Sequence, residues 1–385
     1  MVKKVLYTTQ IKLTTNELSD AWETIANGDI FLSISYLKSL EEGIPSNMQL
    51  FFIEVYDMEK VVGIALVQYI EIKQLSTLGE RDPWLHKQLR NFCLKKFCPG
   101  VLVVGNNLLT GNHGFRHTQG ITSDLFLNTI ENSLQSIQNQ LNIQQKKASM
   151  ITWKDYTFPD YTSFFKPKKY VTLQAQPNMI FHVNVQWKGF EDYKTALQKK
   201  YRQQLQRAQR KIVHLEKKKL NINWIEHNEE QLHALYYAVA ENAPFNTFIL
   251  PKNHFSALKK HLNDQFYLYG YFDQEVLIGF STLIANGKQM DTYFLGYNPQ
   301  VQKNYLLYLN MLYDMVAFSI NQGFEKIVFG RTALEIKSSI GAEPEEVIGW
   351  MQHQKPFIHR NLVKITKWVE PKATWTVRHP FTEKH

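Results

Sequence analysis

The strongest constraint on the fold is an order of predicted elements that occurs twice along the chain. β-Branched and aromatic runs indicate strands, and apolar residues three to five positions apart indicate helices. The first half contains a hairpin, a strand, a helix and a strand at residues 51–57 and 61–72, 101–109, 125–141 and 150–158. The second half repeats this order at 266–274 and 275–285, 290–299, 305–323 and 326–330. Such a repeat predicts two copies of one α/β domain.

The most specific parallel between the halves is a pair of glycine-containing strands. The segments VVGIALVQY and VLIGFSTLI place Gly63 and Gly279 at matching positions. Chance similarity between mixed α/β segments is the alternative explanation. Outside the repeated order, we expect a short strand at residues 220–227, LNINWIEH.

The size of the chain fits this organisation. Its 385 residues, 44% of them hydrophobic, suffice for two domains of ~150 residues each. We predict domains at residues 1–175 and 176–385. The expected fold class is α/β (α+β), and each domain is a mixed twisted sheet flanked by helices. Cys93 and Cys98 make neither a four-cysteine zinc site nor a disulfide scaffold, so we expect reduced structural thiols.

The sequence also bears on location. The N-terminal segment MVKKVLYTTQIKLTT lacks the apolar core of ~7 to 15 residues that a secretory signal needs. The most apolar run, VVGIALVQYI, stops at Glu71 and is shorter than the ~18 residues of a membrane span. We therefore expect no transmembrane segment and a cytoplasmic location.

The net charge of +9 arises from one basic segment, residues 194–219. Apolar residues recur three or four apart across residues 190–219, which predicts one long amphipathic helix at the start of the second domain. Its basic face has three interpretations: a solvated face of a structural helix, a site for RNA or a phosphorylated substrate, or contact with an anionic membrane surface. The candidate anion-binding residues are Lys199, Lys200 and Arg202.

A family resemblance is carried by DTYFLGYNPQVQKNYLLYLNMLYDMVAFSINQGFEKIVFGRTALEIKSSIGAEP, residues 291–344. A strand is followed by a long helix, a Gly-aromatic turn, a strand ending in Gly-Arg, and a helix with a lysine close before a glycine. This order resembles the GNAT superfamily of acyltransferases, in particular its FemAB-like and BioF2-like acetyltransferase branch. The resemblance implies two tandem GNAT-like domains, of which the first is degenerate.

Lys337 is the leading catalytic candidate. In Fem-type ligases, which transfer amino acids from aminoacyl-tRNA to a peptidoglycan precursor, a lysine in a Phe-Lys-x-x-Phe-Gly context is implicated in transfer. Lys337 and Gly341 match this pattern, and isoleucines replace both aromatics. Independently, acyl transfer to an amine passes through an oxyanion that a cation stabilises by ~3 to 4 kcal/mol. A solvated surface lysine is the alternative.

Three further residues are candidates for the chemistry. Strand alternation places Asp291, Tyr293 and Leu295 on one face. Asp291 could be a general base for the incoming ammonium group and Tyr293 could protonate a leaving group, the alternatives being a solvent-facing acid and a packing tyrosine. Arg331 follows a glycine at a strand end, where it could bind carboxylate or phosphate in bidentate fashion.

The resemblance implies acetyl-CoA, another acyl-CoA or aminoacyl-tRNA as the donor. The strand bulge typical of GNAT domains, whose backbone N–H could hold the acyl carbonyl, is expected at Leu295, Gly296 and Tyr297. Ordinary GNAT enzymes bind pyrophosphate through a glycine loop, but residues 302–306 contain no glycine. A weaker anion site at Lys303 and Asn304 is therefore predicted, and conventional CoA binding is disfavoured.

The first half offers a different small-residue loop, Gly111-Asn112-His113-Gly114. Such a loop could cradle a phosphate, and a plain turn is the alternative. His113 and His117 are four residues apart, but Gly114 argues against a regular helix there and no third ligand is near in sequence, so no metal is expected.

The sequence therefore supports two hypotheses of different classes. The first is an N-acyltransferase or aminoacyltransferase acting on a small-molecule or peptide amine, with a connection to cell-envelope or peptidoglycan metabolism implied by the resemblance. The second is a catalytically silent GNAT-fold protein that binds RNA or an anionic surface through its basic helix.

Overall fold

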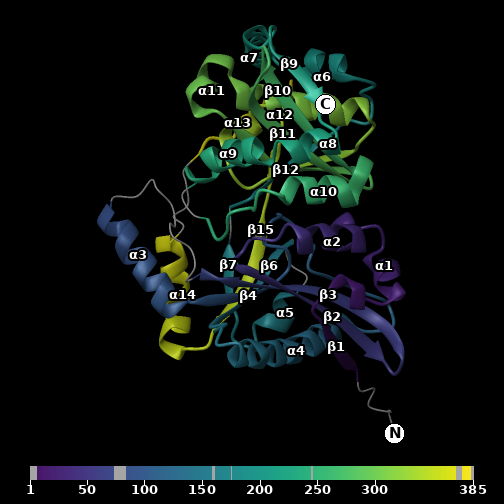
Figure 1. Cartoon of the computed structure of the whole chain (residues 1–385), viewed down its shortest axis with the longest axis vertical. Helices are drawn as coiled ribbons and strands as arrows, with labels where there is room; N and C mark the ends of the chain where they lie inside the picture. Colours follow the sequence, from purple (N-terminus) through teal and green to yellow (C-terminus); the bar gives the residue numbers. More distant parts are fainter. Residues whose placement is uncertain are drawn as a thin grey trace. The chain divides into compact units, whose positions relative to one another are not determined.

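A computed structural model describes residues 7–72, 84–157, 161–174, 176–243, 246–369 and 375–382. The chain forms two compact units. Unit 1 comprises residues 1–175, 243–251 and 347–372, and unit 2 comprises residues 176–242, 252–346 and 373–385. Each unit is built on its own mixed sheet, as Figure 1 shows.

The sheet of unit 1 has eight strands in the order β1-β2-β3-β4-β6-β15-β7, with β5 paired to β3. The strands are β1 (Thr8–Lys12), β2 (Met48–Asp57), β3 (Lys60–Glu71), β4 (Gly100–Val104), β5 (Phe115–His117), β6 (Met150–Thr157), β7 (Val171–Gln174) and β15 (Val347–His353). The helices are α1 (Asp20–Ala26), α2 (Ile34–Glu42), α3 (Trp84–Phe97), α4 (Ser123–Ile143), α5 (Thr162–Phe165) and α14 (Pro356–Val369). Only the β4–β6 pair is parallel among these ladders.

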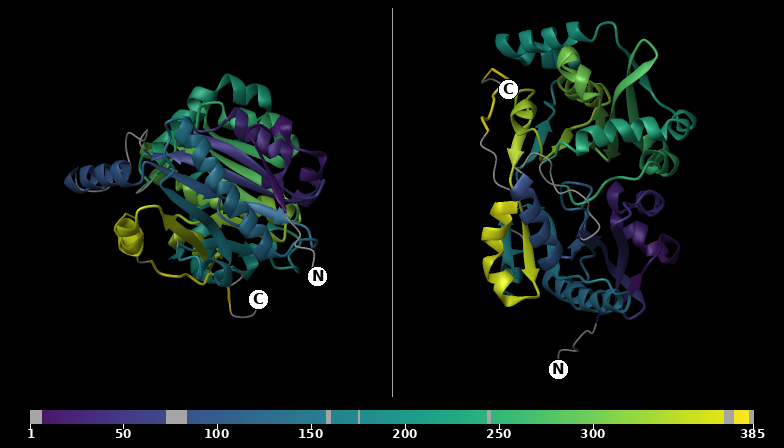
Figure 2. Two further views of the ribbon diagram at one scale, coloured as in Figure 1. Left: turned by 90° about the horizontal axis from the view of Figure 1, so that it is seen from below. Right: turned by 60° about the vertical axis from the view of Figure 1, so that its left-hand side comes forward.

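Alternation along β2 explains how this sheet is covered. Phe51 and Ile53 share a buried core cluster with the apolar face of α4, whereas Phe52 packs edge-on against Trp22 of α1, with ring centroids 5.9 Å apart. Successive strand residues point to opposite faces. Helices α4 and α1 therefore lie on opposite faces of the sheet, which the two views of Figure 2 also show.

The sheet of unit 2 has seven strands in the order β14-β8-β13-β12-β11-β10-β9. The strands are β8 (Asn178–His182), β9 (Glu216–Lys219), β10 (Phe266–Asp273), β11 (Val276–Asn286), β12 (Gln289–Tyr297), β13 (Lys326–Gly330) and β14 (Glu343–Glu345). The helices are α6 (Phe190–Ala196), α7 (Lys199–Lys211), α8 (Ile222–His227), α9 (Glu229–Ala240), α10 (His254–Leu262), α11 (Pro299–Tyr305), α12 (Leu307–Asn321) and α13 (Leu334–Ser338). Strands β12 and β13 form the parallel pair.

The structure confirms the predicted repeat. In unit 1 the hairpin β2–β3 is followed by β4 and the parallel β6, and in unit 2 the hairpin β10–β11 is followed by β12 and the parallel β13. The two glycines lie beneath equivalent helices. A Cβ at Gly63 would be 2.7 Å from Phe126 of α4, and one at Gly279 would be 2.8 Å from Met311 of α12. Both helices approach the sheet closely because these positions lack a side chain.

Each sheet includes one strand from a distant part of the chain. Strand β15 lies between β6 and β7 in the first sheet, and β8 lies between β13 and β14 in the second. The sequence predicts a second domain over residues 176–385, whereas in the structure residues 347–372 belong to unit 1. The difference arises because β15 completes its hydrogen bonding on β6 and β7, which the local sequence pattern cannot reveal.

The predicted helix 190–219 is wrong as one element. It consists of α6 and α7, separated by extended Leu197, and of the edge strand β9. Leu197 bridges Phe381, and the Gln198 N–H donates to the Pro380 carbonyl at 2.8 Å, so tertiary hydrogen bonds replace helical ones. The predicted strand 220–227 is also wrong, since Asn221 caps the Trp224 N–H and starts α8.

The contact beneath α4 generates a stability prediction. Changing Gly63 to alanine inserts a methyl group against the fully buried ring of Phe126, and overpacking of this kind costs ~1 to 3 kcal/mol. We expect unit 1 of this variant to unfold at a lower urea concentration than unit 1 of the unchanged protein. Tryptophan fluorescence during a urea titration measures the midpoint. Gly120→Ala is the control, because its new Cβ would meet only Thr118 Oγ1 at 3.4 Å. Equal midpoints for the two variants would contradict the close-approach explanation.

Candidate active site

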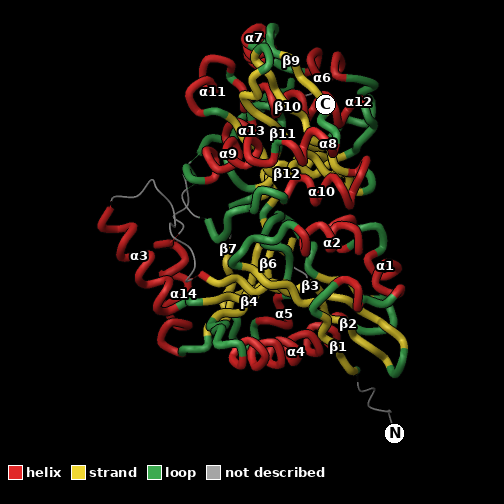
Figure 3. Tube along the Cα trace, in the orientation of Figure 1, coloured by secondary structure: helices red, strands yellow, loops and turns green. Residues whose placement is uncertain are grey.

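The candidate site lies where the parallel strands β12 and β13 separate. Their ladder has three pairs and ends at Asp291 and Val328. Beyond this point β12 continues along β11, and β13 continues along β8. The yellow strands of unit 2 in Figure 3 belong to this sheet. Backbone groups that face the opening have lost their sheet partners, so other groups must satisfy them or bind a ligand.

Strand β12 has a bulge just after Asp291, its last residue paired with β13. Ser281 of β11 pairs with Leu295, and Leu283 pairs with Thr292, so β12 contains one extra residue. The side chains of Tyr293 and Phe294 consequently both reach His254, with ring centroids 5.8 and 6.3 Å away. The bulge is expected at Leu295 to Tyr297 from the sequence and lies at Tyr293 and Phe294 instead.

The displaced bulge alters which residues share a face. Leu295 packs into the same core cluster as Met290, whereas Tyr293 stacks on His254 of α10. The predicted common face of Asp291, Tyr293 and Leu295 is therefore wrong for Leu295, because an extra residue inverts the alternation after it.

The segment after β13 is shaped by backbone conformations that favour glycine. Gly330, Ala333 and Gly341 have φ values of 74°, 54° and 105°. A Cβ at Gly341 would lie 2.5 Å from the ring of Phe381, so glycine is also required there by the close approach. Between these turns, the short helix α13 carries Lys337 back toward the end of β13.

Lys337 is buried, with only 4% of its surface exposed. Its Nζ donates to the carbonyl oxygens of Phe329 at 2.6 Å and Gly330 at 3.4 Å. Both carbonyls lie just past the last β12–β13 pair. Within the part of the chain that the structure describes, Lys337 has no carboxylate partner. The side chain is therefore a buried amine at the strand opening, not a solvated surface lysine.

Burial has a direct electrostatic consequence for this amine. Loss of hydration lowers the pKa of Lys337 from 10.5 to about 7. Both the charged and the neutral form are accordingly available near neutral pH. A group with such a pKa can donate hydrogen bonds to an oxyanion when charged and accept a proton when neutral.

The other two catalytic candidates, the carboxylate of Asp291 and the phenol of Tyr293, lie on β12. Asp291 is buried, forms the last ladder pair with Val328, and accepts a hydrogen bond from Gln289 Nε2 at 2.8 Å. The Tyr293 hydroxyl lies 3.1 Å from His254 Nε2. His254 is fully buried, and the sequence analysis did not identify it, because its partner is 39 residues away and no motif surrounds it.

The remaining catalytic and donor-binding candidates are placed differently. Arg331 is half-buried immediately after Gly330. Gly296 is buried, and a Cβ there would lie 2.5 Å from the α9 backbone. Tyr297 packs in a small cluster with Tyr271 and Leu307. Helix α9 therefore occupies the space beside Gly296.

Residues 302–306 do not form a loop. They belong to α11 and to Leu306, whose φ of 48° separates α11 from α12. Lys303 and Asn304 are exposed on α11. In place of a glycine loop, Asn310 Nδ2 donates to the carbonyl oxygens of Tyr305 and Leu306 at 2.9 and 3.3 Å. The break between the helices is thus held by a buried side chain.

The three basic candidates at α7 have distinct environments. Lys199 and Lys200 are exposed. Arg202 donates to three carbonyl oxygens that end α6, those of Lys194, Thr195 and Leu197, at 2.8 to 3.2 Å. Its guanidinium therefore serves as a C-terminal cap of α6, a role that the predicted unbroken helix over residues 190–219 would not allow.

Unit 1 has a counterpart of the strand opening. Past the last β4–β6 pair, β6 bulges at Lys154 and Asp155, and Asp155 has a φ of 60°. Asp155 binds Lys154 Nζ and accepts weakly from the Gly111 N–H at 3.4 Å. The Gly111 loop is thus tied to the protein's own carboxylate.

The two histidines of this region have ordinary partners. His113 Nδ1 lies 3.0 Å from the Asp29 carboxylate, which Arg116 also binds at 2.7 Å. Burial alone would raise the pKa of Asp29, but His113 and Arg116 hold it below its usual value. His117 bonds the Thr118 carbonyl and Ser123. Among the described residues no group of three metal-ligating side chains occurs, and no helix is long and apolar enough to span a membrane.

These features define a chain of two units, each with a GNAT-like fold. No protein-family model matches the sequence, and no curated protein matches it. Among solved structures, FemX has a TM-score of 0.55 at 11% identity over 93% of this chain and 99% of that chain. A tandem GNAT protein from the clavulanic acid biosynthesis pathway has a TM-score of 0.48 at 10% identity, over 90% and 99% of the chains. L-PGS from Bacillus licheniformis has a TM-score of 0.45 at 11% identity, over 86% of this chain and 93% of that chain.

The likeness to FemX extends over both units and confirms the predicted fold.

The buried amine generates a prediction about stability and pH. Because the folded pKa of Lys337 is about 7 and its ordinary value is 10.5, the unfolded chain binds more protons between these values. Stability should therefore rise with pH across this window and be lowest below it. We expect Lys337→Met to remove this dependence, which is roughly 5 kcal/mol in full for a shift from 10.5 to about 7 at ~1.36 kcal/mol per pKa unit, with about half of it between pH 7 and pH 9. Urea unfolding of both proteins at about pH 7 and about pH 9 measures it, and parallel changes in the two would refute burial of a charged amine.

The cap formed by Arg202 generates a second prediction. Arg202→Ala leaves three carbonyl groups of α6 without their donor, and we expect a loss of ~1 kcal/mol in unfolding free energy, since the site is exposed. Lys199→Ala is the matched control on the same turn and should leave stability unchanged. The check is thermal unfolding followed by circular dichroism; a larger loss for Lys199→Ala than for Arg202→Ala would be inconsistent with the cap.

Proposed function

We propose that unit 2 catalyses transfer of an acyl or aminoacyl group from an ester or thioester donor to an amine. The observation that carries this proposal is the buried amine of Lys337 at the opening between β12 and β13. A lysine without a carboxylate partner is costly to bury, and perturbed amines of this kind cluster at functional sites. The FemX-like fold supports the same class of reaction.

In the proposed reaction the acceptor nitrogen forms a bond to the acyl carbon, and the carbonyl oxygen becomes an oxyanion. Lys337 in its charged form has three N–H donors, of which two serve Phe329 and Gly330. The third stabilises the oxyanion. Collapse of the intermediate breaks the bond from the acyl carbon to the donor's oxygen or sulfur, and an amide forms.

Asp291 and Tyr293 supply the proton transfers in this scheme. The Asp291 carboxylate takes the proton that the attacking nitrogen loses. The Tyr293 hydroxyl, positioned by His254, gives a proton to the leaving group. Arg331 binds a carboxylate or phosphate of a substrate, which holds the reacting atoms in place.

The donor that fits best is an aminoacyl-tRNA. A CoA thioester needs backbone N–H groups that approach its pyrophosphate, and α11 with exposed Lys303 and Asn304 stands where a glycine loop would do this. The acceptor is an amine on a small molecule or peptide, and the Fem-type resemblance favours a peptidoglycan precursor.

The test is a transfer assay with purified protein, aminoacyl-tRNA, acetyl-CoA and a panel of amine acceptors. We expect amide formation from aminoacyl-tRNA and a loss of ~100-fold to 1,000-fold in kcat for Lys337→Met, the usual cost of removing one oxyanion donor. Lys288→Met, a change of an exposed lysine in the β11–β12 turn, should retain full activity.

Three results would overturn parts of this proposal. Transfer from acetyl-CoA alone would refute the tRNA donor. Full activity of Lys337→Met, with the folded structure verified by circular dichroism, would refute the role of the amine. Absence of transfer from every donor would refute the enzymatic function itself.

A further inference from the structure

Unit 1 contains a basic pocket. A pocket of about 370 Å³ is lined by Lys95, Lys96, Phe97, Pro99, Lys147, Ser149, Gln354 and Lys355. These residues come from the end of α3, the start of β4, the segment before β6 and the segment before α14. The volume falls within the ~300 to 1,000 Å³ of small-ligand sites.

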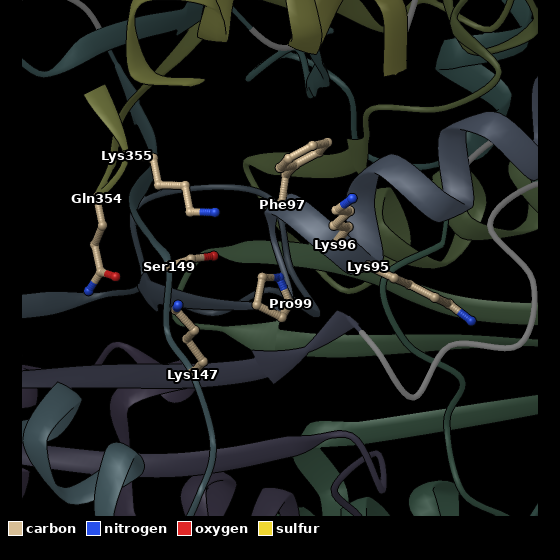
Figure 4. A pocket seen from close by; sticks show the side chains of 8 residues that line it. All are labelled: Lys95, Lys96, Phe97, Pro99, Lys147, Ser149, Gln354 and Lys355. Carbon is tan, nitrogen blue, oxygen red and sulfur yellow. The ribbon is translucent and has the colours of Figure 1, made fainter. Parts of the chain in front are cut away.

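The lining is strongly cationic and contains no carboxylate. Figure 4 shows the ammonium groups of Lys147 and Lys355 entering the pocket on either side of Ser149, while Lys95 points away. Ser149 forms a buried floor, and its carbonyl accepts from the Gln354 N–H at 3.0 Å. Lysine is the sole charged residue type in this lining, so the pocket favours an anion.

Some lysines of the chain pair with carboxylates and others do not. Six lysines at least partly exposed to solvent have a carboxylate partner: Lys168 with Glu131, Lys194 with Glu191, Lys217 with Asp314, Lys218 with Glu216, Lys252 with Glu230 and Lys288 with Glu325. Across the described residues, no such pair includes a pocket lysine. Their recorded partners are aromatic, since Lys96 and Lys355 lie 5.8 and 5.7 Å from the Phe97 ring centroid. Mutual repulsion among them is relieved when an anion binds.

Apolar side chains are exposed on the helices that flank the pocket. On α3, Leu89, Phe92 and Phe97 are 57%, 59% and 39% exposed, and on α14, Phe357 is 72% exposed. Helix α3 ends at the pocket and α14 begins beside it. Exposed aromatic residues next to lysines are the combination found where proteins contact the interface of an anionic bilayer.

We propose that this pocket binds the phosphate group of an anionic phospholipid headgroup, with Lys96, Lys147 and Lys355 as its ligands. The exposed aromatic residues of α3 and α14 contact the surrounding lipid. A free phosphate or pyrophosphate has the same chemistry for the lysines but makes no use of the exposed apolar side chains, so the two sources can be separated by experiment.

The experiment is sedimentation of the full-length protein with vesicles of phosphatidylcholine, with and without phosphatidylglycerol. We expect binding only to vesicles that contain phosphatidylglycerol. Changing Lys96, Lys147 and Lys355 together to glutamine should weaken this binding roughly a hundredfold, from the usual contribution per basic residue at an anionic surface. All three side chains are exposed, so the variant should fold.

The matched control removes the same charge from the same unit. Lys38, Lys60 and Lys166 are exposed lysines that do not line the pocket. Lys60, for example, begins β3, whereas the other end of β3 is near the pocket because Glu71 pairs there with Gly100. Their triple change to glutamine should leave vesicle binding nearly unchanged. An equal loss in both triple variants would refute the pocket in favour of general charge attraction.

A separate arm distinguishes lipid from free phosphate. Pyrophosphate, titrated by calorimetry in the absence of vesicles, should bind weakly, and Phe92→Ser with Phe357→Ser should reduce vesicle binding without changing that titration. Tight pyrophosphate binding with no vesicle binding would overturn the lipid assignment. Neither assay depends on acyl transfer, so the proposal stands or falls independently of the proposed enzymatic function.

Discussion

The central constraint on this protein is the need to complete the edge of each parallel strand pair. Strand β13 can pair with β12 for only three residues before the two strands separate, and β6 has a similarly short ladder with β4. Each is stabilised on its other edge by a strand from a distant part of the chain, β8 for β13 and β15 for β6. Because backbone groups inside a sheet must be hydrogen-bonded, these strands allow each sheet to open on one side while β13 and β6 stay paired on the other.

At the opening between β12 and β13, the amine of Lys337 satisfies backbone carbonyl groups that have no partner on β12. It donates to carbonyl groups of Phe329 and Gly330, where β12 no longer runs alongside. A charged amine loses hydration there, which lowers its pKa, so structural and chemical roles coincide in one side chain. In unit 1 the equivalent bulge carries Lys154 and Asp155, which bind each other. The charge of Lys154 in the unit 1 opening is therefore balanced by a carboxylate. The amine of Lys337 in the unit 2 opening has no carboxylate partner among the described residues.

Much of the fold could be predicted because its signals are local. The hairpins, the central helices and the matching of Gly63 with Gly279 follow from periodicity and from glycine, and the structure confirms them. Burial of Lys337 could not be read from its sequence, since a lysine on a short helix is usually solvated. The pairing of β15 with β6 and β7, the break at Leu197 and the contact of His254 with Tyr293 all depend on residues distant in sequence, which a local pattern does not contain.

The lysine pocket illustrates why charge runs are an incomplete guide to anion sites. In the sequence, the segment 194–219 dominates the net charge, yet its members are dispersed among a helix cap, a strand and exposed positions. Lys199 and Lys200 lie one residue apart, but a helix directs adjacent side chains about 100° apart, so neighbours in sequence diverge. Lys96, Lys147 and Lys355 are far apart in sequence and line one pocket. Convergence of charge on a ligand is therefore a property of the fold, and only a structure can reveal it.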